Sequence, residues 1–355
     1  AKELNFTTKL MQNFLQNTAA NFIGARKVTY IVSGVLVVIG ILGVNPHIMG
    51  KLNLGIDFSG GRNYIIRFAE PVNTEEVNAA LDNVFMAAKS ELADEETFAL
   101  NVITIGDANQ VRVSTNYRIN DNSETLDDEI EALLYEGCKQ FLPENVTLKE
   151  FTSTDINPEI GIMQSQKVGP AIADDITQSA VWAVLAALLG IFLYVLLRFR
   201  NFSFSVGALA GLAHNTLIVL GAYALLWKVM PFSMEIDQSF IAAILTVIGY
   251  SINDTVVIFD RVREYTGLYP KRARKQNIND ALNQTLSRTF STSMSTLVVL
   301  IAIFCFGGET IRGFVFALII GVVVGTYSSL CVATPLAYDI QEALDRRKAK
   351  KALKK

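Results

Sequence analysis

The chain has 355 residues, of which 51% are hydrophobic and 18% are charged, with a mean hydropathy of +0.33 and a formal net charge of −3. A composition this apolar excludes a wholly soluble protein. The sequence contains no zinc-ligand spacing, P-loop, dinucleotide-binding fingerprint or nucleophile elbow. We therefore expect no enzyme activity, no metal site and no nucleic-acid partner.

The N-terminal residues 1–27 predict a cytoplasmic segment with an amphipathic helix on the inner membrane surface, or equally an ordinary docking helix. About 20 apolar residues cross the hydrocarbon core of a bilayer. The first apolar run is long enough for a membrane anchor and has no cleavage site close behind it, so we expect it to be retained. Six runs predict transmembrane helices, at Val28–Val44, Ser179–Leu197, Ser203–Leu226, Phe240–Phe259, Leu286–Phe306 and Gly313–Tyr338.

Charge near the ends of these runs predicts their orientation, because cytoplasmic loops carry an excess of Lys and Arg. Both termini are expected in the cytoplasm, and residues 339–355 form a basic cytoplasmic tail. The large segment 45–178 is expected outside the cytoplasm, followed by a five-helix membrane domain over 179–338. Residues 45–179 hold 9 Lys and Arg against 23 Asp and Glu, a balance of 9 − 23 = −14. The small net charge of the whole chain therefore results from an acidic segment 45–179 and basic segments elsewhere.

The large outer segment alternates strand and helix patterns over residues 62–156, which we expect to fold as a unit. Helices are predicted after Asn73 with Glu76 and after Thr125 with Asp128, pairs that resemble capping boxes. The order strand, helix, strand, strand, helix, strand is that of a ferredoxin-like α+β domain. The expected fold is thus a polytopic α-helical membrane protein with one such domain. The strands are expected at Asn63–Phe68, Phe98–Ile105, Gln110–Thr115 and Val146–Phe151, with a turn at 106–109.

The stretch LGIDFSGG follows the first span. Gly60 and Gly61 permit backbone conformations that other residues avoid and allow close approach of the large outer segment to the membrane part, and Gly55 belongs to the same motif. Asp57 is expected to cap a tight turn here, or to belong to a functional connection between the outer domain and the membrane.

An acid inside the fourth span is the strongest candidate functional residue. Asp254 lies in the inner half of that span, where an unpaired charge costs at least about 2.5–3.5 kcal/mol. Arg288 is the candidate partner. A static ion pair that fixes helix register and a proton relay are equally compatible with these two residues. Helical spacing places other polar residues on the same faces, which favours the relay: Thr246, Tyr250 and Asn253 beside Asp254, and Thr285, Thr292 and Ser295 beside Arg288.

His214 and Asn215 form a second polar point, midway along the third span. A histidine can transfer protons near neutral pH, but a single one is more often hydrogen-bonded between helices.

Four stretches together resemble the SecD/SecF family of bacterial protein-export membrane proteins, a branch of the resistance-nodulation-division superfamily. They are LGIDFSGG, GPAIADDI at Gly169–Ile176, VIGYSINDTVVIFDRVRE at Val247–Glu264 and LSRTFSTS at Leu286–Ser293. The resemblance covers nearly the whole chain. Members often have an acid where this chain has Asn215.

The resemblance implies one half of a pseudo-symmetric unit whose other half is SecD, either as a separate chain or fused to this one. It also implies a place in the bacterial inner membrane beside the SecYEG channel, with lipid around the helices. There the unit would pull unfolded preprotein outward after the ATPase SecA has pushed it through. Proton flow would drive this step without a cofactor, and sodium is an open alternative. The implied proton path contains Asp254 and Arg288, with Tyr250, Asn253 and Thr292 beside them.

Two other functions remain open at this stage. The chain could be a passive scaffold that stabilises SecD and the channel, with Asp254 and Arg288 as a structural pair. It could also be a proton-coupled exporter of small molecules or lipids, although one modest outer domain argues against that.

Overall fold

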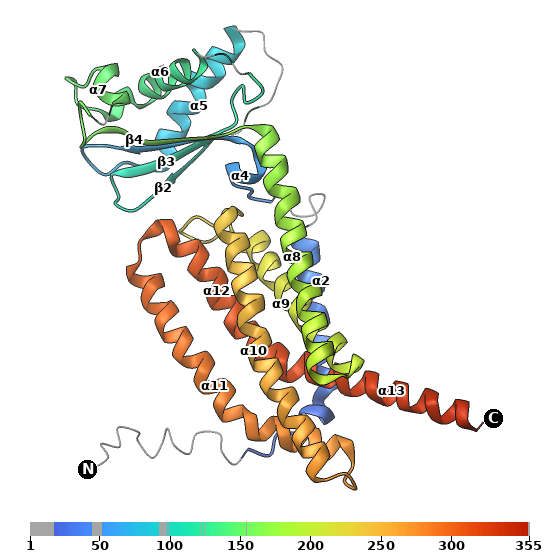
Figure 1. The fold of residues 1–355 in the computed structure, drawn as a ribbon. Coiled ribbons are helices and arrows are strands. Elements are labelled where there is room, and N and C mark those ends of the chain that lie inside the picture. The colour runs from blue at the N-terminus through green and yellow to red at the C-terminus, as the bar shows by residue number, and fades with distance from the viewer. Residues whose placement is uncertain are drawn as a thin grey trace, which may run out of the picture.

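The structure is a computed structural model that describes residues 18–44, 52–91, 98, 100–121, 123, 125–153 and 155–353. A four-stranded sheet with helices on one face stands at one end of a bundle of long helices (Figure 1). In the described part of the chain, six helices are long and apolar enough to cross a membrane, in agreement with the six expected spans. The protein is therefore an integral membrane protein. The amphipathic helix expected within 1–27 lies mostly outside the described residues.

The bundle helices extend beyond the apolar runs because polar caps and charged turns continue them into the loops. Asn201 and Asp237 each cap the helix that follows, accepting hydrogen bonds from the backbone N–H groups of Ser203 and Phe240. The helices are α2 (Phe22–Val44), α8 (Pro170–Phe199), α9 (Phe202–Leu226), α10 (Gln238–Leu268), α11 (Arg274–Phe306) and α12 (Glu309–Ser328), followed by α13 (Thr334–Ala352).

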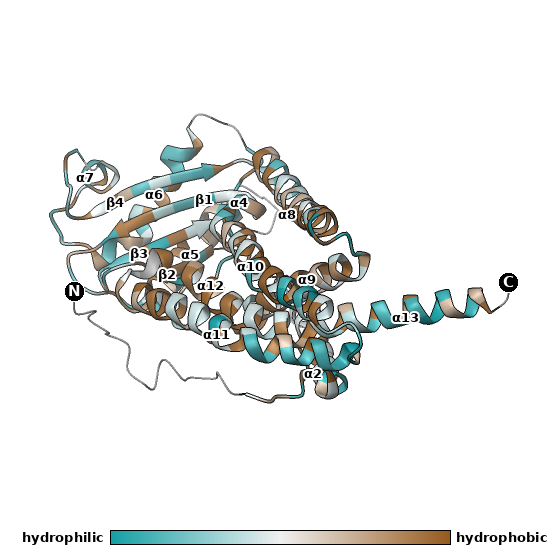
Figure 2. Ribbon diagram, turned by 60° about the horizontal axis from the view of Figure 1, so that its bottom comes forward, coloured by the Kyte–Doolittle hydropathy of each residue, from teal (hydrophilic) through white to brown (hydrophobic). Residues whose placement is uncertain are grey.

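The sixth expected span is not one regular helix. A π-helical turn, Ser329–Ala333, separates α12 from α13. Beyond it α13 leaves the bundle and runs sideways, and Figure 2 shows its distal half as mainly hydrophilic. Two ion pairs hold this direction, Arg26 with Asp339 at 2.9 Å and Arg274 with Asp345 at 2.6 Å. The basic tail expected from residue 339 is thus helical through Ala352.

The described residues of 56–168 lie outside the helix bundle, and we call them the outer domain for that reason. They form an antiparallel sheet in the strand order β2-β3-β1-β4. Alternate residues of its strands, such as Tyr64 and Val113, are buried in a core with Leu81 and Leu134 from the covering helices. The opposite face of the sheet points toward the bundle (Figure 1). The elements are α4 (Ile56–Ser59), β1 (Gly61–Arg67), α5 (Thr74–Glu91), β2 (Leu100–Thr104), β3 (Gln110–Thr115), α6 (Leu126–Cys138), α7 (Leu148–Thr152) and β4 (Gly161–Val168).

The expected fourth strand, Val146–Phe151, is wrong, because most of that segment is helix α7. Thr147 accepts a hydrogen bond from the Glu150 backbone N–H, and the Glu150 carboxylate accepts one from the Thr147 backbone, which is a capping box. Thr125, expected to cap α6 in this way, makes no capping bond with its side chain. The strand that completes the sheet is β4, further along the chain, where it pairs with β1.

The sheet predicts that a soluble fragment of residues 61–168 folds by itself, whereas one of residues 62–156 does not. The shorter fragment lacks β4, so β1 loses one of its two partners and the core loses Ile162. Circular dichroism and a cooperative thermal transition check this expectation. A cooperative transition in the shorter fragment would show that β4 is dispensable.

Candidate functional site

Asp254 lies in the middle of α10 and inside the bundle. Its exposed fraction is 6%, and among the described residues its Oδ2 atom has no hydrogen-bond partner. A buried carboxylate oxygen without a partner is costly in an apolar environment. This position therefore requires either a proton on the carboxylate or polar groups close by.

Polar side chains from four helices surround this level of the bundle. Three contacts cross between helices: Asn215 Nδ2 donates to Ser251 Oγ at 2.8 Å, Thr255 Oγ1 lies 2.9 Å from Ser329 Oγ, and Ser293 Oγ lies 2.6 Å from Thr326 Oγ1. We call these residues, together with Asp254, His214 and Thr289, the central polar cluster. All of its members except the half-buried Thr326 are at least nine-tenths buried.

The buried polar stripe of α11 differs from the one expected. Thr285, Thr289 and Ser293 point into the bundle, at a spacing of four residues, whereas Arg288 and Thr292 are exposed. No ion pair joins Arg288 to Asp254 in the described part of the chain, although the two charges interact at longer range. Helix α11 is thus rotated relative to the expected pairing.

The other expected residues of α10 are also spread around the helix. Asn253 and Thr246 are exposed, and Tyr250 is half-buried and donates from its hydroxyl to Thr296 Oγ1 at 3.2 Å. The proton-path assignments of these residues stay predictions.

Arg288 lines a cleft between α10 and α11. The cleft has a volume of about 340 Å³, and Asp260, Arg261, Glu264 and Gln284 also line it. Asp260 forms ion pairs with Arg198 at 3.0 Å and with Arg263 at 3.3 Å. The cleft therefore lies at a charged end of the bundle, beside the part of α10 that follows Asp254.

The π-helical turn belongs to this site and was not among the expected features. Pro335 has no N–H to donate to the carbonyl of Cys331, and that carbonyl accepts a hydrogen bond from Thr29 Oγ1 at 3.1 Å instead. The extra residue of the turn places Ser329 against Thr255. The Ser-Ser and Thr-Pro pairs around the turn are the signal that could have predicted it.

His214 and Asn215 form the α9 side of the cluster. His214 Nδ1 lies 3.3 Å from Asn215 Oδ1, and its Nε2 has no partner among the described residues. The His214 ring also packs on the ring of Tyr327, whose hydroxyl lies 3.0 Å from Ser33 Oγ. Asn215 thus joins α9 to α10 by a hydrogen bond and carries no charge.

The LGIDFSGG segment lies against the loop that precedes α10. Gly55 N donates to Ile236 O at 2.9 Å, and Ile236 N donates to Asn53 O at 2.8 Å. Asp57 Oδ2 accepts a hydrogen bond from Gln238 N at 3.1 Å. Asp57 therefore caps α10, the helix that carries Asp254, rather than a turn of its own segment.

Gly60 and Gly61 make the sharp turn from α4 into β1. Their φ angles are +69° and +151°, which side chains with a Cβ rarely adopt. A Cβ on Gly61 would also lie 2.9 Å from the carbonyl oxygen of Thr115. The paired glycines are thus required by the backbone itself.

Comparison with known proteins agrees with this arrangement. The model of the SecD/SecF protein-export C-terminal domain matches residues 148–343, and the model of the SecD/SecF GG motif matches residues 50–72. The protein translocase subunit SecF of Rhodothermus marinus is 39% identical over 326 residues, 92% of this chain and 94% of the relative. That of Thermodesulfovibrio yellowstonii is 34% identical over 92% of this chain and 96% of the relative.

A solved structure has the same arrangement. The crystal structure of SecDF from Thermus thermophilus, described as a translocon-associated membrane protein, matches with a TM-score of 0.71 at 28% identity. The match covers 93% of this chain but only 40% of the SecDF chain. The present chain therefore corresponds to less than half of that protein.

Replacing Gly61 with Ala is expected to destabilise the junction of α4 and β1 by about 1–3 kcal/mol, because the backbone is strained for any Cβ and the Thr115 carbonyl is in the way. Gly169→Ala is the matched control, since Gly169 has ordinary φ of −69° and open space around it. Hydrogen exchange of β1 and β3 in the full chain checks this, and equal exchange in both variants would contradict it.

Proposed function

Because the chain belongs to the SecD/SecF family of protein-export membrane proteins, we propose that it couples proton flow across the membrane to late-stage preprotein export. The observation that carries this proposal is the buried Asp254 carboxylate, one oxygen of which has no partner in the described residues. A carboxylate in this state can take up and release a proton at little structural cost.

The surroundings of Asp254 support a relay more than a static ion pair. A static pair requires direct contact with a cation, and no described cation makes an ion pair with Asp254. The hydroxyl groups of Ser293, Thr326 and Thr289 can instead pass a proton along a chain of hydrogen bonds or orient water in the cluster that contains the carboxylate. The cleft with Arg288 supplies a polar exit at the charged end of the bundle.

The direction of transport and the partners follow from the proposal. The proton would pass from the outer side, where the domain stands, to the cytoplasmic side, where both termini and the charged ends of α10 and α11 lie. SecD, fused or separate, would supply the remaining part of the unit, consistent with the 40% share of the SecDF chain. The unit would act in the bacterial inner membrane beside SecYEG on unfolded preprotein, and only indirectly with SecA.

We further propose that the outer domain is of the ferredoxin-like class. Apart from the short helices α4 and α7 and one 3-10 turn, its described elements run in the order β1, α5, β2, β3, α6, β4, and the sheet order is β2-β3-β1-β4 with antiparallel neighbours. Such a domain offers a rigid body that small movements of the bundle can displace.

Asp254→Asn is expected to abolish export while the protein still accumulates and binds SecD, because the substitution keeps the size but removes the titratable group. Pulse-chase of preprotein translocation in cells depleted of the native protein measures this. Asp280→Asn is the matched control, since it neutralises a partly exposed acid of the neighbouring helix α11 that pairs with Arg272 at 3.6 Å and lies outside the cleft with Arg288. Wild-type export by the Asp254→Asn chain would refute the relay.

Arg288→Ala is expected to reduce export more than Arg288→Lys, because a cation near Asp254 favours its charged form and thus proton release. The exposed position and the long-range interaction predict that charge matters more than the forked shape of guanidinium. Proton uptake into proteoliposomes, with sodium held equal on both sides, checks that Arg288→Ala loses more activity than Arg288→Lys and that protons are the coupling ion. Equal loss in both variants would mean that shape is required.

A further inference from the structure

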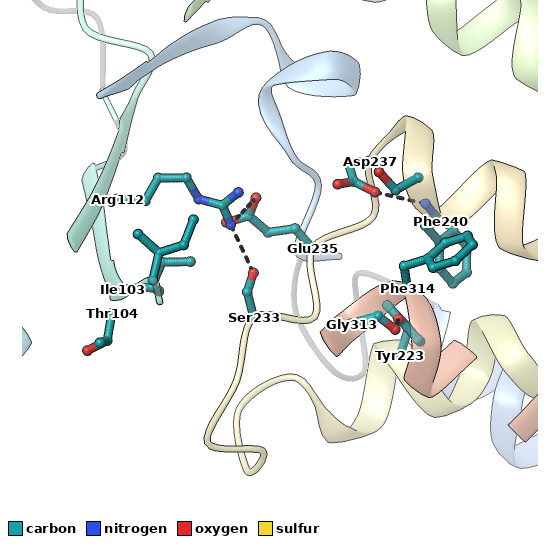
Figure 3. Close-up of a pocket in the computed structure, with 12 residues that line it drawn as sticks. Ile103, Thr104, Arg112, Tyr223, Ser233, Glu235, Asp237, Phe240, Gly313 and Phe314 are labelled. Carbon is teal, nitrogen blue, oxygen red and sulfur yellow. Dashed lines mark hydrogen bonds and ion pairs between the residues drawn. The ribbon is translucent and has the colours of Figure 1, made fainter. Parts of the chain in front are cut away.

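The outer domain touches the bundle through a buried ion pair that lies outside the chain connections. Arg112, on the bundle-facing side of β3, makes an ion pair with Glu235 at 3.1 Å and donates to Ser233 Oγ at 3.0 Å (Figure 3). The exposed fractions of the two charged side chains are only 18% and 8%. The pair closes one side of a cavity of about 30 Å³ whose other walls include Tyr223, Gly313 and Phe314.

The loop that carries Glu235 also begins α10. Ile236 pairs with the backbone of Asn53 and Gly55. The Asp57 carboxylate accepts a hydrogen bond from the backbone N–H of Gln238, and the Asp237 carboxylate accepts one from that of Phe240. A displacement of this loop therefore moves the first turn of α10, and Asp254 lies on the same rigid helix. The outer domain and the central polar cluster are joined through one short segment.

The charges at this junction do not balance. The carboxylates that face one another are Glu235 and Asp237 of the loop and Asp57 of α4, and the facing cation is Arg112. Arg312, at the start of α12, lies over the ring of Phe304 and has a further interaction of its own. Among the groups that interact with Glu235 and Asp237, three acids share the Arg112 guanidinium, and proton uptake relieves the cost of burying their negative charge.

We propose that Arg112 is a positioning residue that docks the outer domain on the outer end of α10, and that protonation of the Glu235 and Asp237 carboxylates strengthens this docking. The role of this docking rests on the proposed function, in which the junction faces the side from which protons would enter. The geometry of the docking itself does not depend on export.

The direction of the pH effect follows from burial. Burial raises the pKa of Glu235 above its ordinary value of 4.5, and Arg112 lowers it by a smaller amount. Burial also raises the pKa of Asp237 above 3.8. When the domain separates, water reaches both groups and their pKa values fall to the ordinary range. Protonation of these two groups therefore stabilises the docked state fully at a pH below their ordinary pKa values. This stabilisation is lost as the pH rises through the raised pKa values of the docked state.

The distance between the domain and the bundle measures docking directly. Spin labels on Ala79→Cys of α5 and Phe306→Cys of α11, both exposed, report it in the full chain with Cys305 and Cys331 replaced by Ser, reconstituted in nanodiscs. We expect the docked fraction of the wild-type background to fall as the pH rises from about 5 to about 8. Glu235→Gln should flatten this dependence, because the amide cannot ionise.

Arg112→Gln should make docking depend more strongly on acid, because Glu235 then loses the cation that lowers its pKa. Arg112→Lys should restore part of the wild-type profile. Arg67→Gln is the matched control, since Arg67 lies on the same sheet face and makes no ion pair with the described bundle residues.

Two results would overturn the proposal. One is a wild-type distance distribution that is the same at every pH, and the other is equal loss of docking at every pH in Arg112→Gln, which marks a merely structural contact. The measurement involves no preprotein and no proton gradient, so its failure would leave the proposed export function standing. Conversely, loss of export in Asp254→Asn does not bear on docking.

Discussion

The placement of one carboxylate inside an apolar bundle is the constraint on which the rest of the membrane part depends. Asp254 must have polar neighbours or a proton, since an isolated charge there would be expelled or neutralised. The bundle meets this requirement with hydroxyl and amide groups from α9, α10, α11, α12 and the π-helical turn. Uncharged neighbours leave the carboxylate free to change its protonation state, whereas a contacting cation would hold it ionised.

The N-terminal end of the helix that carries this acid is held by contacts with the outer domain. Asp57 caps α10 from the LGIDFSGG segment, and Arg112 holds the preceding loop from the sheet. Both contacts are polar, so water would compete with them if the domain moved as proposed. A helix that is rigid between a titratable centre and a polar junction can transmit a small rotation over its whole length.

Much of this architecture was predictable from local sequence. The apolar runs, three of the four strands, the turn at 106–109 and the cap at Asn73 depend on neighbouring residues, and the structure has them at the expected places. The fourth strand was not predictable in the same way. A Thr-x-x-Glu capping box at Thr147 overrode the β-branched pattern there, and the true strand, β4, follows a turn and has polar residues at exposed edge positions.

The sequence predicted the central acid of the candidate site but not the arrangement of the side chains around it. By itself the sequence determined that the chain has six membrane-length helices, that Asp254 is the acid in need of explanation, and that two glycines end the LGIDFSGG segment, because each depends on composition over a few turns. Only the tertiary structure decided that Thr289 and Ser293 rather than Arg288 face the bundle, and that Arg112 meets Glu235. Helix rotation and contacts between segments more than a hundred residues apart arise from packing, which no local pattern encodes.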